Sequence, residues 1–156
     1  MSKSLKRVRA ALEAAGVTYD LREMSAPTRT AQEAADAAGC HIDQIAKAII
    51  FRGESSGHVR LFLTAGGNRV SAEKASAVAG EALGKADAEL IRAETGFAIG
   101  GVAPVGHLNP VQAYLDPRLM EFDLVWAAAG TPRHIFSIAP NALHSLTGAA
   151  ISDFTD

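Results

Sequence analysis

The sequence predicts a single α+β domain built on a mixed, largely antiparallel sheet with flanking helices. Short apolar segments typical of strands are interspersed with short amphipathic helices, without the regular strand–helix–strand alternation of a doubly wound fold. The chain has 156 residues, of which 48% are hydrophobic, so it can bury one sizeable core. Because no repeat, linker or low-complexity segment interrupts it, we expect one domain over residues 1–156.

In the first half of the chain, the spacing of apolar residues indicates the elements. Leu5, Val8 and Leu12 recur at helical spacing, and Thr28 or Thr30 is suited to cap a second helix. Alternating apolar residues in two later runs indicate a hairpin. The predicted elements are a helix at 4–15, a strand at 17–22, a helix at 31–38, and two hairpin strands, one in the later half of 42–51 and one at 58–65.

In the second half, caps and prolines delimit the elements. Ser71 and Asp87 are residues that cap helix N-termini, and Pro140 suits the first turn of a helix that Gly148 ends. The predicted elements are helices at 71–79, 88–94 and 140–148, strands at 111–116, 122–129 and 134–138, and an edge strand within 149–154.

Composition and charge exclude several classes of protein. The formal net charge of -2 and the pI of about 6.2 give no broad basic face, so we expect no DNA partner. Cys40 is the only cysteine, which excludes a disulfide framework and a multi-cysteine zinc site and suits a reducing compartment. No apolar run approaches the ~20 residues that span a bilayer. We therefore expect a cytoplasmic protein without a membrane partner.

No motif supports a metal site, nucleotide hydrolysis or a protein nucleophile. The histidines show neither HxH nor HxxxH spacing, and the GxxxxGK[ST] and helix-opening GxGxxG patterns are absent. Ser71 is better explained as a cap, and Cys40 has no visible triad context.

The most unusual stretch covers residues 96–107, where four glycines and one proline punctuate an almost wholly apolar run. Glycine allows another group to approach the backbone closely, and proline makes the turn rigid. One interpretation is an outward array of main-chain N–H groups that binds an anion or a developing oxyanion. The other is a tight bend between two strands. Composition alone favours the bend.

Lys47 lies inside an apolar strand, and two histidines flank the candidate cleft. A buried lysine is almost never unpaired, so Lys47 either faces a polar cleft or points outward from an alternating strand. In a cleft it would hold a phosphate or a carboxylate as a point charge. His107 directly follows the glycine-rich stretch, and His134 follows Pro132 and could face the same cleft.

Several segments taken together resemble one family. They are residues 28–35, 44–52, 67–71, the glycine-rich stretch, and 126–130. The most specific features are Lys47 in its strand and the GxxxP pattern at residues 100–104. On these residues the chain resembles, over nearly its full length, the YbaK/EbsC family. Its members are free-standing relatives of the editing domain inserted in bacterial prolyl-tRNA synthetase.

The resemblance implies trans-editing, which is hydrolysis of the ester that links a wrong amino acid to tRNA, typically tRNA(Pro). It also implies a curved, barrel-like sheet and no metal or organic cofactor. Family members generally lack a protein nucleophile, so a water aided by the ribose hydroxyl, or that hydroxyl itself, attacks. By this resemblance Gly100 and Gly101 hold the ester carbonyl through backbone amides, and Lys47 holds the terminal adenosine region. The expected substrate-binding residues are Val102, Ala103, Pro104, His107 and His134.

Further contacts to the tRNA phosphates are expected from basic residues on the first helix and near two turns. The candidates are Lys3, Lys6, Arg7, Arg9, Arg52 and Arg69, and solvated surface is the alternative for all of them. Prolyl-tRNA synthetase is a candidate partner. A second hypothesis of another class is a non-catalytic binding module that recognises an amino acid, the tRNA 3′ end or a synthetase. Retention of both Lys47 and the GxxxP loop favours the enzyme.

Overall fold

Eight strands in two sheets form the framework of the protein in the computed structural model, which describes residues 2–156. The strands are β1 (Asp20–Glu23), β2 (Ala46–Gly53), β3 (Val59–Ala65), β4 (Leu83–Lys85), β5 (Gln112–Leu115), β6 (Val125–Ala128), β7 (His134–Ile138) and β8 (Ala150–Ile151). The helices are α1 (Lys3–Ala14), α2 (Ala31–Ala38), α3 (Ala72–Ala79), α4 (Ala88–Thr95) and α5 (Pro140–Thr147), with 3-10 helices η1 (Ile42–Gln44) and η2 (Pro117–Glu121).

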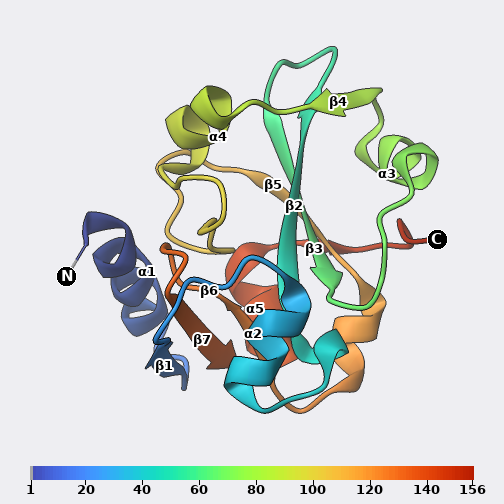
Figure 1. The fold of residues 1–156 in the computed structure, drawn as a ribbon. Coiled ribbons are helices and arrows are strands. Elements are labelled where there is room, and N and C mark those ends of the chain that lie inside the picture. The colour runs from blue at the N-terminus through green and yellow to red at the C-terminus, as the bar shows by residue number, and fades with distance from the viewer. Residues whose placement is uncertain (1) are drawn as a thin grey trace.

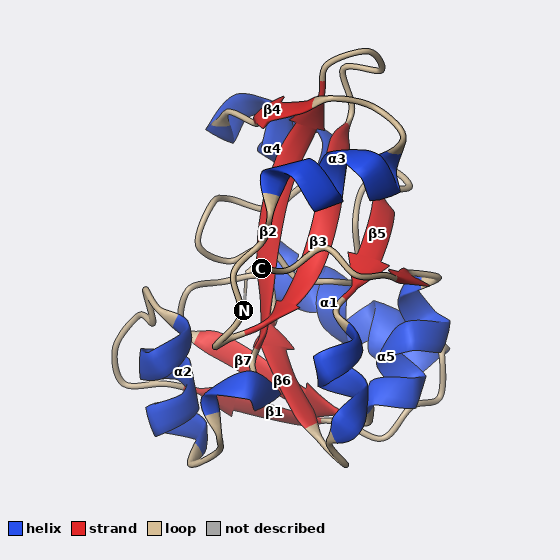
Figure 2. Ribbon diagram, turned by 90° about the vertical axis from the view of Figure 1, so that its right-hand side faces the viewer, coloured by secondary structure: helices blue, strands red, loops and turns tan. Residues whose placement is uncertain are grey.

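The larger sheet has the strand order β4-β2-β3-β5-β8, and the smaller has the order β1-β7-β6. The smaller sheet is antiparallel throughout, whereas β5 runs parallel to β3 and β8 runs parallel to β5. In Figure 1 the long β2–β3 hairpin stands upright, with the smaller sheet near its lower end. Figure 2 shows the strands running through the middle of the molecule and the helices around them.

The mixed α+β class is confirmed, but the barrel-like closure of the sheet is wrong. The two sheets meet through a parallel bridge between Ile45 and Trp126. Closure would require β6 to continue alongside β2 as a hydrogen-bonded ladder, and their pairing stops at that bridge. The sheets therefore stay separate, and β4 and β8 remain edge strands of the larger one.

The main core lies between the two sheets and the helices that cover them, and it includes Leu12, Leu63, Phe97 and Phe136. Two smaller clusters flank it, one under α2 and one under α3. Alanines at the buried positions of α2 let this helix pack closely against the smaller sheet. None of the helices within residues 2–156 is long and apolar enough to cross a membrane.

Elements with strong local signals appear where they were predicted. The side chains of Thr30, Ser71 and Asp87 each accept a hydrogen bond at the start of a helix, and Gly39 and Gly148 end two helices in the left-handed conformation. The predicted β2–β3 hairpin is confirmed.

Elements with weak local signals were misjudged. β4 was not predicted, because three residues are too few to show a period. The predicted strand at 17–22 begins only at Asp20, and the strand at 122–129 is confined to Val125–Ala128. The predicted strand at 111–116 ends at Leu115, and Asp116 is instead the start of η2, where its carboxylate caps the helix.

Candidate active site

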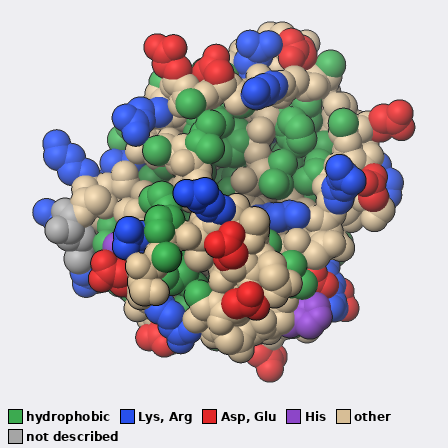
Figure 3. Space-filling view, viewed as in Figure 1, with side chains coloured by type: hydrophobic (Ala, Val, Ile, Leu, Met, Phe, Trp, Pro, Cys, Tyr) green, Lys and Arg blue, Asp and Glu red, His purple; other side chains and the backbone are tan. Residues whose placement is uncertain are grey.

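A cavity of about 780 Å³ opens beside β2, between the start of α2 and the glycine-rich segment. Its walls are mostly apolar, and Figure 3 shows a hollow on this face lined by hydrophobic side chains with Lys and Arg side chains near its edge. The larger apolar side chains that line it are Ile42, Ile45, Ile49, Ile50, Ile91, Ile99, Val102, Trp126 and Ile135.

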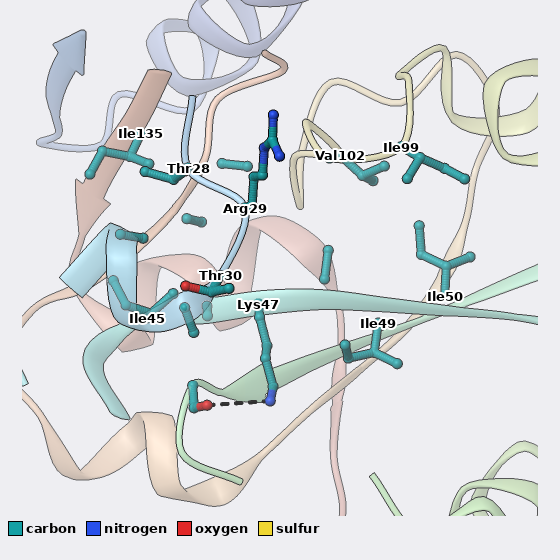
Figure 4. Close-up of a pocket in the computed structure, with 18 of the residues that line it drawn as sticks. Thr28, Arg29, Thr30, Ile45, Lys47, Ile49, Ile50, Ile99, Val102 and Ile135 are labelled. Atoms are coloured by element: carbon teal, nitrogen blue, oxygen red, sulfur yellow. Dashed lines mark hydrogen bonds between the residues drawn. The ribbon is translucent and has the colours of Figure 1, made fainter. Parts of the chain in front are cut away.

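The charged side chains among the described residues that line the cavity are all cations. They are Arg29, Lys47 and Lys85, which come from the segment before α2, from β2 and from β4. Figure 4 shows Arg29 rising between Thr28 and Val102, while Lys47 extends from β2 on another side. A cavity with positive charge and apolar walls suits a ligand that carries both anionic and apolar groups. Neither Arg29 nor Lys85 was among the predicted site residues, although Arg29 lies in one of the segments that carry the family resemblance.

Lys47 is half-buried, and its ammonium group is held by a single turn. Nζ donates hydrogen bonds to the carbonyl oxygen of Asn68 at 2.6 Å and to that of Gly66 at 3.3 Å. Burial lowers the pKa of Lys47 from its usual value, and Arg69 lowers it further, while Asp43 and Asp116 act in the opposite direction. Two of the three N–H donors are thus engaged, which leaves one for a ligand in the cavity.

The glycine-rich segment contributes Ile99, Gly100 and Val102 to the cavity wall. Gly100 has φ of +93°, and the N–H of Gly101 donates to Ala98 at 3.1 Å to close a tight turn. The amide of Gly101 is therefore used within the loop. Among the described residues no acceptor is paired with the N–H groups of Gly100 and Val102. The same holds for the N–H of Ile99, so this wall carries three backbone N–H groups that have no acceptor within residues 2–156.

Two side chains, Arg7 and His107, donate hydrogen bonds that hold the glycine-rich segment in place. Arg7 donates to the carbonyl oxygens of Gly96 at 2.7 Å and Gly106 at 3.2 Å, and its guanidinium lies 4.9 Å from the centre of the Phe97 ring. His107 donates from Nε2 to Ala103 at 2.7 Å. Burial lowers the pKa of His107, with a smaller effect in the same direction from Arg7. Arg7 thus has a structural role within the fold.

The remaining predicted substrate-binding residues lie away from the cavity lining. Ala103 is fully buried, and Pro104 and His107 face a different cavity on the far side of the loop. His134 lines a third cavity, where Nδ1 is hydrogen-bonded to Thr131 at 2.7 Å. Of the predicted site residues, the structure brings Lys47, Gly100 and Val102 together around one cavity.

The basic residues proposed for tRNA contact lie at scattered places. Lys6 and Arg9 are on α1, where Arg9 is 3.7 Å from Glu13. Arg52 pairs with Glu54 at the far end of the hairpin. Arg69 follows the turn that holds Lys47 and is close enough to affect its pKa. None of these four lines the cavity described above. Within residues 2–156 no group of three His, Cys, Asp or Glu side chains is placed to hold a metal ion.

A comparison with known families identifies the chain as an aminoacyl-tRNA editing domain. Residues 25–146 match the model of the family described as the aminoacyl-tRNA editing domain, so the chain belongs to this family. Membership confirms the resemblance to the YbaK-like proteins that Lys47 and the GxxxP loop indicated. It places the protein in aminoacyl-tRNA editing.

Individual proteins are similar to the chain in sequence or structure. The chain is 30% identical over 140 residues to the uncharacterized protein YwhH of Bacillus subtilis (strain 168). The aligned part covers 90% of this chain and 88% of that protein. It is 46% identical to the crystal structure of "a putative trans-editing enzyme for prolyl tRNA synthetase", with a TM-score of 0.92 over 100% of this chain and 99% of that chain. The hypothetical protein APE2540 is 28% identical, with a TM-score of 0.87 over 96% of this chain and 99% of that one.

Proposed function

We propose that this protein is a trans-acting deacylase, which hydrolyses the ester bond of tRNA(Pro) carrying a small wrong amino acid such as alanine or cysteine. The observation that carries the proposal is the cavity beside β2, where apolar walls, the backbone of the glycine-rich segment and three cations surround one space. The similarity to a protein described as a trans-editing enzyme for prolyl-tRNA synthetase supports the choice of tRNA(Pro).

The geometry suits an aminoacyl ester at the end of an RNA. The apolar wall can receive a small side chain, and the cations can contact the terminal nucleotide and its phosphate. A cavity with fixed walls rejects a ligand of the wrong shape, although a difference of one methylene group is worth only about 1–3 kcal/mol. Discrimination against proline therefore depends on its ring shape and on the rigidity of the walls.

The reaction needs little chemistry from the protein, because an aminoacyl ester is already activated. Water adds to the ester carbonyl carbon, the bond from that carbon to the ribose oxygen breaks, and the ribose oxygen takes a proton. The amides of Gly100 and Val102 are the groups proposed to stabilise the charge on the carbonyl oxygen. One oxyanion donor of this kind is worth roughly 3–4 kcal/mol. Lys47 is proposed to hold the terminal adenosine, so that the ester lies against these amides.

The first test is the deacylation of tRNA(Pro) charged with alanine, cysteine, serine, threonine or 2-aminobutyrate, beside correctly charged prolyl-tRNA(Pro). We expect rapid loss of one or two small amino acids while prolyl-tRNA is spared. If no member of the panel is hydrolysed, with or without prolyl-tRNA synthetase, the deacylase proposal is wrong. The binding-module alternative would then be supported if the same RNAs bind without turnover.

Replacement of Lys47 tests its role in this reaction. Loss of a hydrogen bond from a charged group costs about 1.5–3 kcal/mol, so Lys47→Ala is expected to lower kcat/KM by roughly 10- to 100-fold. Lys74→Ala is the matched control, because Lys74 is an exposed lysine paired with Asp153 on another part of the surface. Equal activity of the two variants, with both folded, would refute the role of Lys47.

A further inference from the structure

The ammonium group of Lys47 is positioned by backbone carbonyls rather than by a carboxylate. Both acceptors, the carbonyl oxygens of Gly66 and Asn68, belong to the turn that follows β3. This turn is closed by a hydrogen bond from the N–H of Asn68 to Ala65 at 2.9 Å. The direction of the lysine side chain therefore depends on how firmly the turn is fixed.

Asp116 fixes the turn at both of its ends. Its side chain lies in the core and is only 2% exposed, although a carboxylate is rarely buried without several partners. Oδ2 accepts hydrogen bonds from the N–H of Ala65 at 3.1 Å and from Nδ2 of Asn68 at 2.9 Å. Oδ1 accepts from the N–H of Arg118 at 3.0 Å, which ties the same carboxylate to the start of η2.

Asp43 fixes the middle of the same turn from η1. Oδ1 accepts from the N–H of Gly67 at 2.8 Å, and Oδ2 accepts from Nε of Arg118 at 3.0 Å. Burial alone would raise the pKa of Asp43, but the hydrogen bonds from Arg118 and Gly67 outweigh it and lower the pKa. A Cβ atom at Gly66 would overlap the carbonyl oxygen of Ile42, so the turn is packed closely against η1.

We infer that Asp116 is a positioning residue for the candidate site, acting on Lys47 through Asn68 and the turn at residues 65–68. It does not reach the cavity lining itself. With Asp43, it holds the two carbonyl oxygens in the place where they receive the ammonium group. The inference rests on the proposed function for its kinetic consequence, but the geometry of Lys47 can be measured without it.

A double-mutant cycle tests whether Asp116 acts through Lys47. Asp116→Asn keeps the side-chain shape but presents an amide to the donors of the turn. We expect it to lower kcat/KM for mischarged tRNA(Pro) by about tenfold, by analogy with the 10- to 100-fold losses seen when residues that orient metal ligands are replaced. In a Lys47→Ala background the same change is expected to alter kcat/KM by less than about twofold, since residues in one network are not additive. An equal effect in both backgrounds would overturn the inference.

A second variant and a control distinguish a loss of positioning from misfolding. Asn68→Ala removes one partner of Asp116 at a partly exposed site and leaves the backbone carbonyl in place, so it is expected to reproduce the effect in the same direction. Asp153→Asn is the matched control at an exposed carboxylate. Urea unfolding establishes the folded fraction, so that a loss of stability is not counted as a loss of positioning.

The position of Lys47 has a readout that does not need catalysis. In ¹⁵N-labelled protein, the ammonium protons of Lys47 are expected to exchange more slowly than those of the exposed Lys6, and this difference is expected to disappear in Asn68→Ala and Asp116→Asn. An inactive wild-type protein that keeps this pattern would contradict the proposed function and support the positioning role. Unchanged exchange in both folded variants would overturn the positioning role whatever the activity.

Discussion

At the scale of single residues, the neighbours Gly100 and Gly101 are required as glycines for two different structural reasons. Gly100 has φ of +93°, which side chains rarely adopt, but a Cβ atom there would meet nothing within 4 Å. Gly101 needs no such angle, but its Cβ would lie 2.9 Å from the backbone of Thr131. The first glycine is therefore required by conformation, and the second is required by a close approach of two chain segments.

These two causes predict different results for substitution by alanine. Gly100→Ala is expected to cost about 1–2 kcal/mol in the free energy of unfolding, the usual penalty for left-handed backbone. Gly101→Ala forces the loop away from Thr131 and is expected to reduce kcat by more than Gly100→Ala does. Urea unfolding and deacylation kinetics measure both effects. A Gly101→Ala protein with wild-type kcat would show that the approach to Thr131 is not needed for turnover.

At the scale of elements, Glu81 joins the tip of the β2–β3 hairpin to the segment after α3. Its carboxylate accepts hydrogen bonds from the N–H groups of Ser55 and Ser56 at 3.0 and 2.9 Å, and it forms an ion pair with Arg60. The hydrogen bond from Ser56 and then that from Arg60 lower the pKa of Glu81 to about 2. Arg60 also donates to Tyr114 at 3.1 Å, which connects this junction to β5.

A lowered pKa in the folded state gives stability that is present above the unfolded value, near 4.5, and is lost as the pH falls toward about 2. We therefore expect Glu81→Gln to be less stable than the wild type at pH 7, and the difference to shrink between about pH 4.5 and 2. Denaturant unfolding over this pH range measures it. Glu89→Gln, an exposed change on α4, is the control. A difference that stays constant with pH would show that the charge of Glu81 is not the cause.

At the scale of the whole molecule, charge is distributed unevenly. The chain has a formal net charge of -2, yet the charged side chains among the described residues lining the cavity are three cations. Binding of an RNA end by such a site is expected to weaken with salt, because each phosphate contact releases counterions. The acidic remainder of the surface limits attraction to RNA elsewhere.

This distribution predicts which cations contribute to the salt dependence of catalysis. Removing one contact to single-stranded RNA reduces the slope of log affinity against log salt by about 0.7. Arg29→Ala is expected to reduce the slope of log kcat/KM by about this amount. Arg52→Ala, at the far end of the hairpin, is expected to leave it unchanged. The opposite ranking would place the RNA along the hairpin rather than over the cavity.

Comparison of prediction and structure shows where local information is sufficient. The caps at Thr30, Ser71 and Asp87, and the hairpin around residues 53–57, depend on neighbours a few residues away, and all appear as predicted. Short elements such as β4, and the limits of β1 and β6, depend on strand partners that are distant in the chain. Those partners leave no periodic signal, so these elements were missed or misplaced.

In the candidate site, too, features that depend on nearby residues could be predicted, and features that depend on distant residues could not. Lys47 and the GxxxP loop are locally unusual, as a charge within an apolar strand and a cluster of glycines, but only the resemblance to a known family favoured a site over an outward lysine and a plain bend. The contacts of Arg7 with the glycine-rich loop and of Asp116 with the turn that holds Lys47 could not be predicted from the sequence. Each of these contacts joins residues brought together only by packing of the two sheets and their helices. Their distances follow from tertiary contacts rather than from any local preference of the chain.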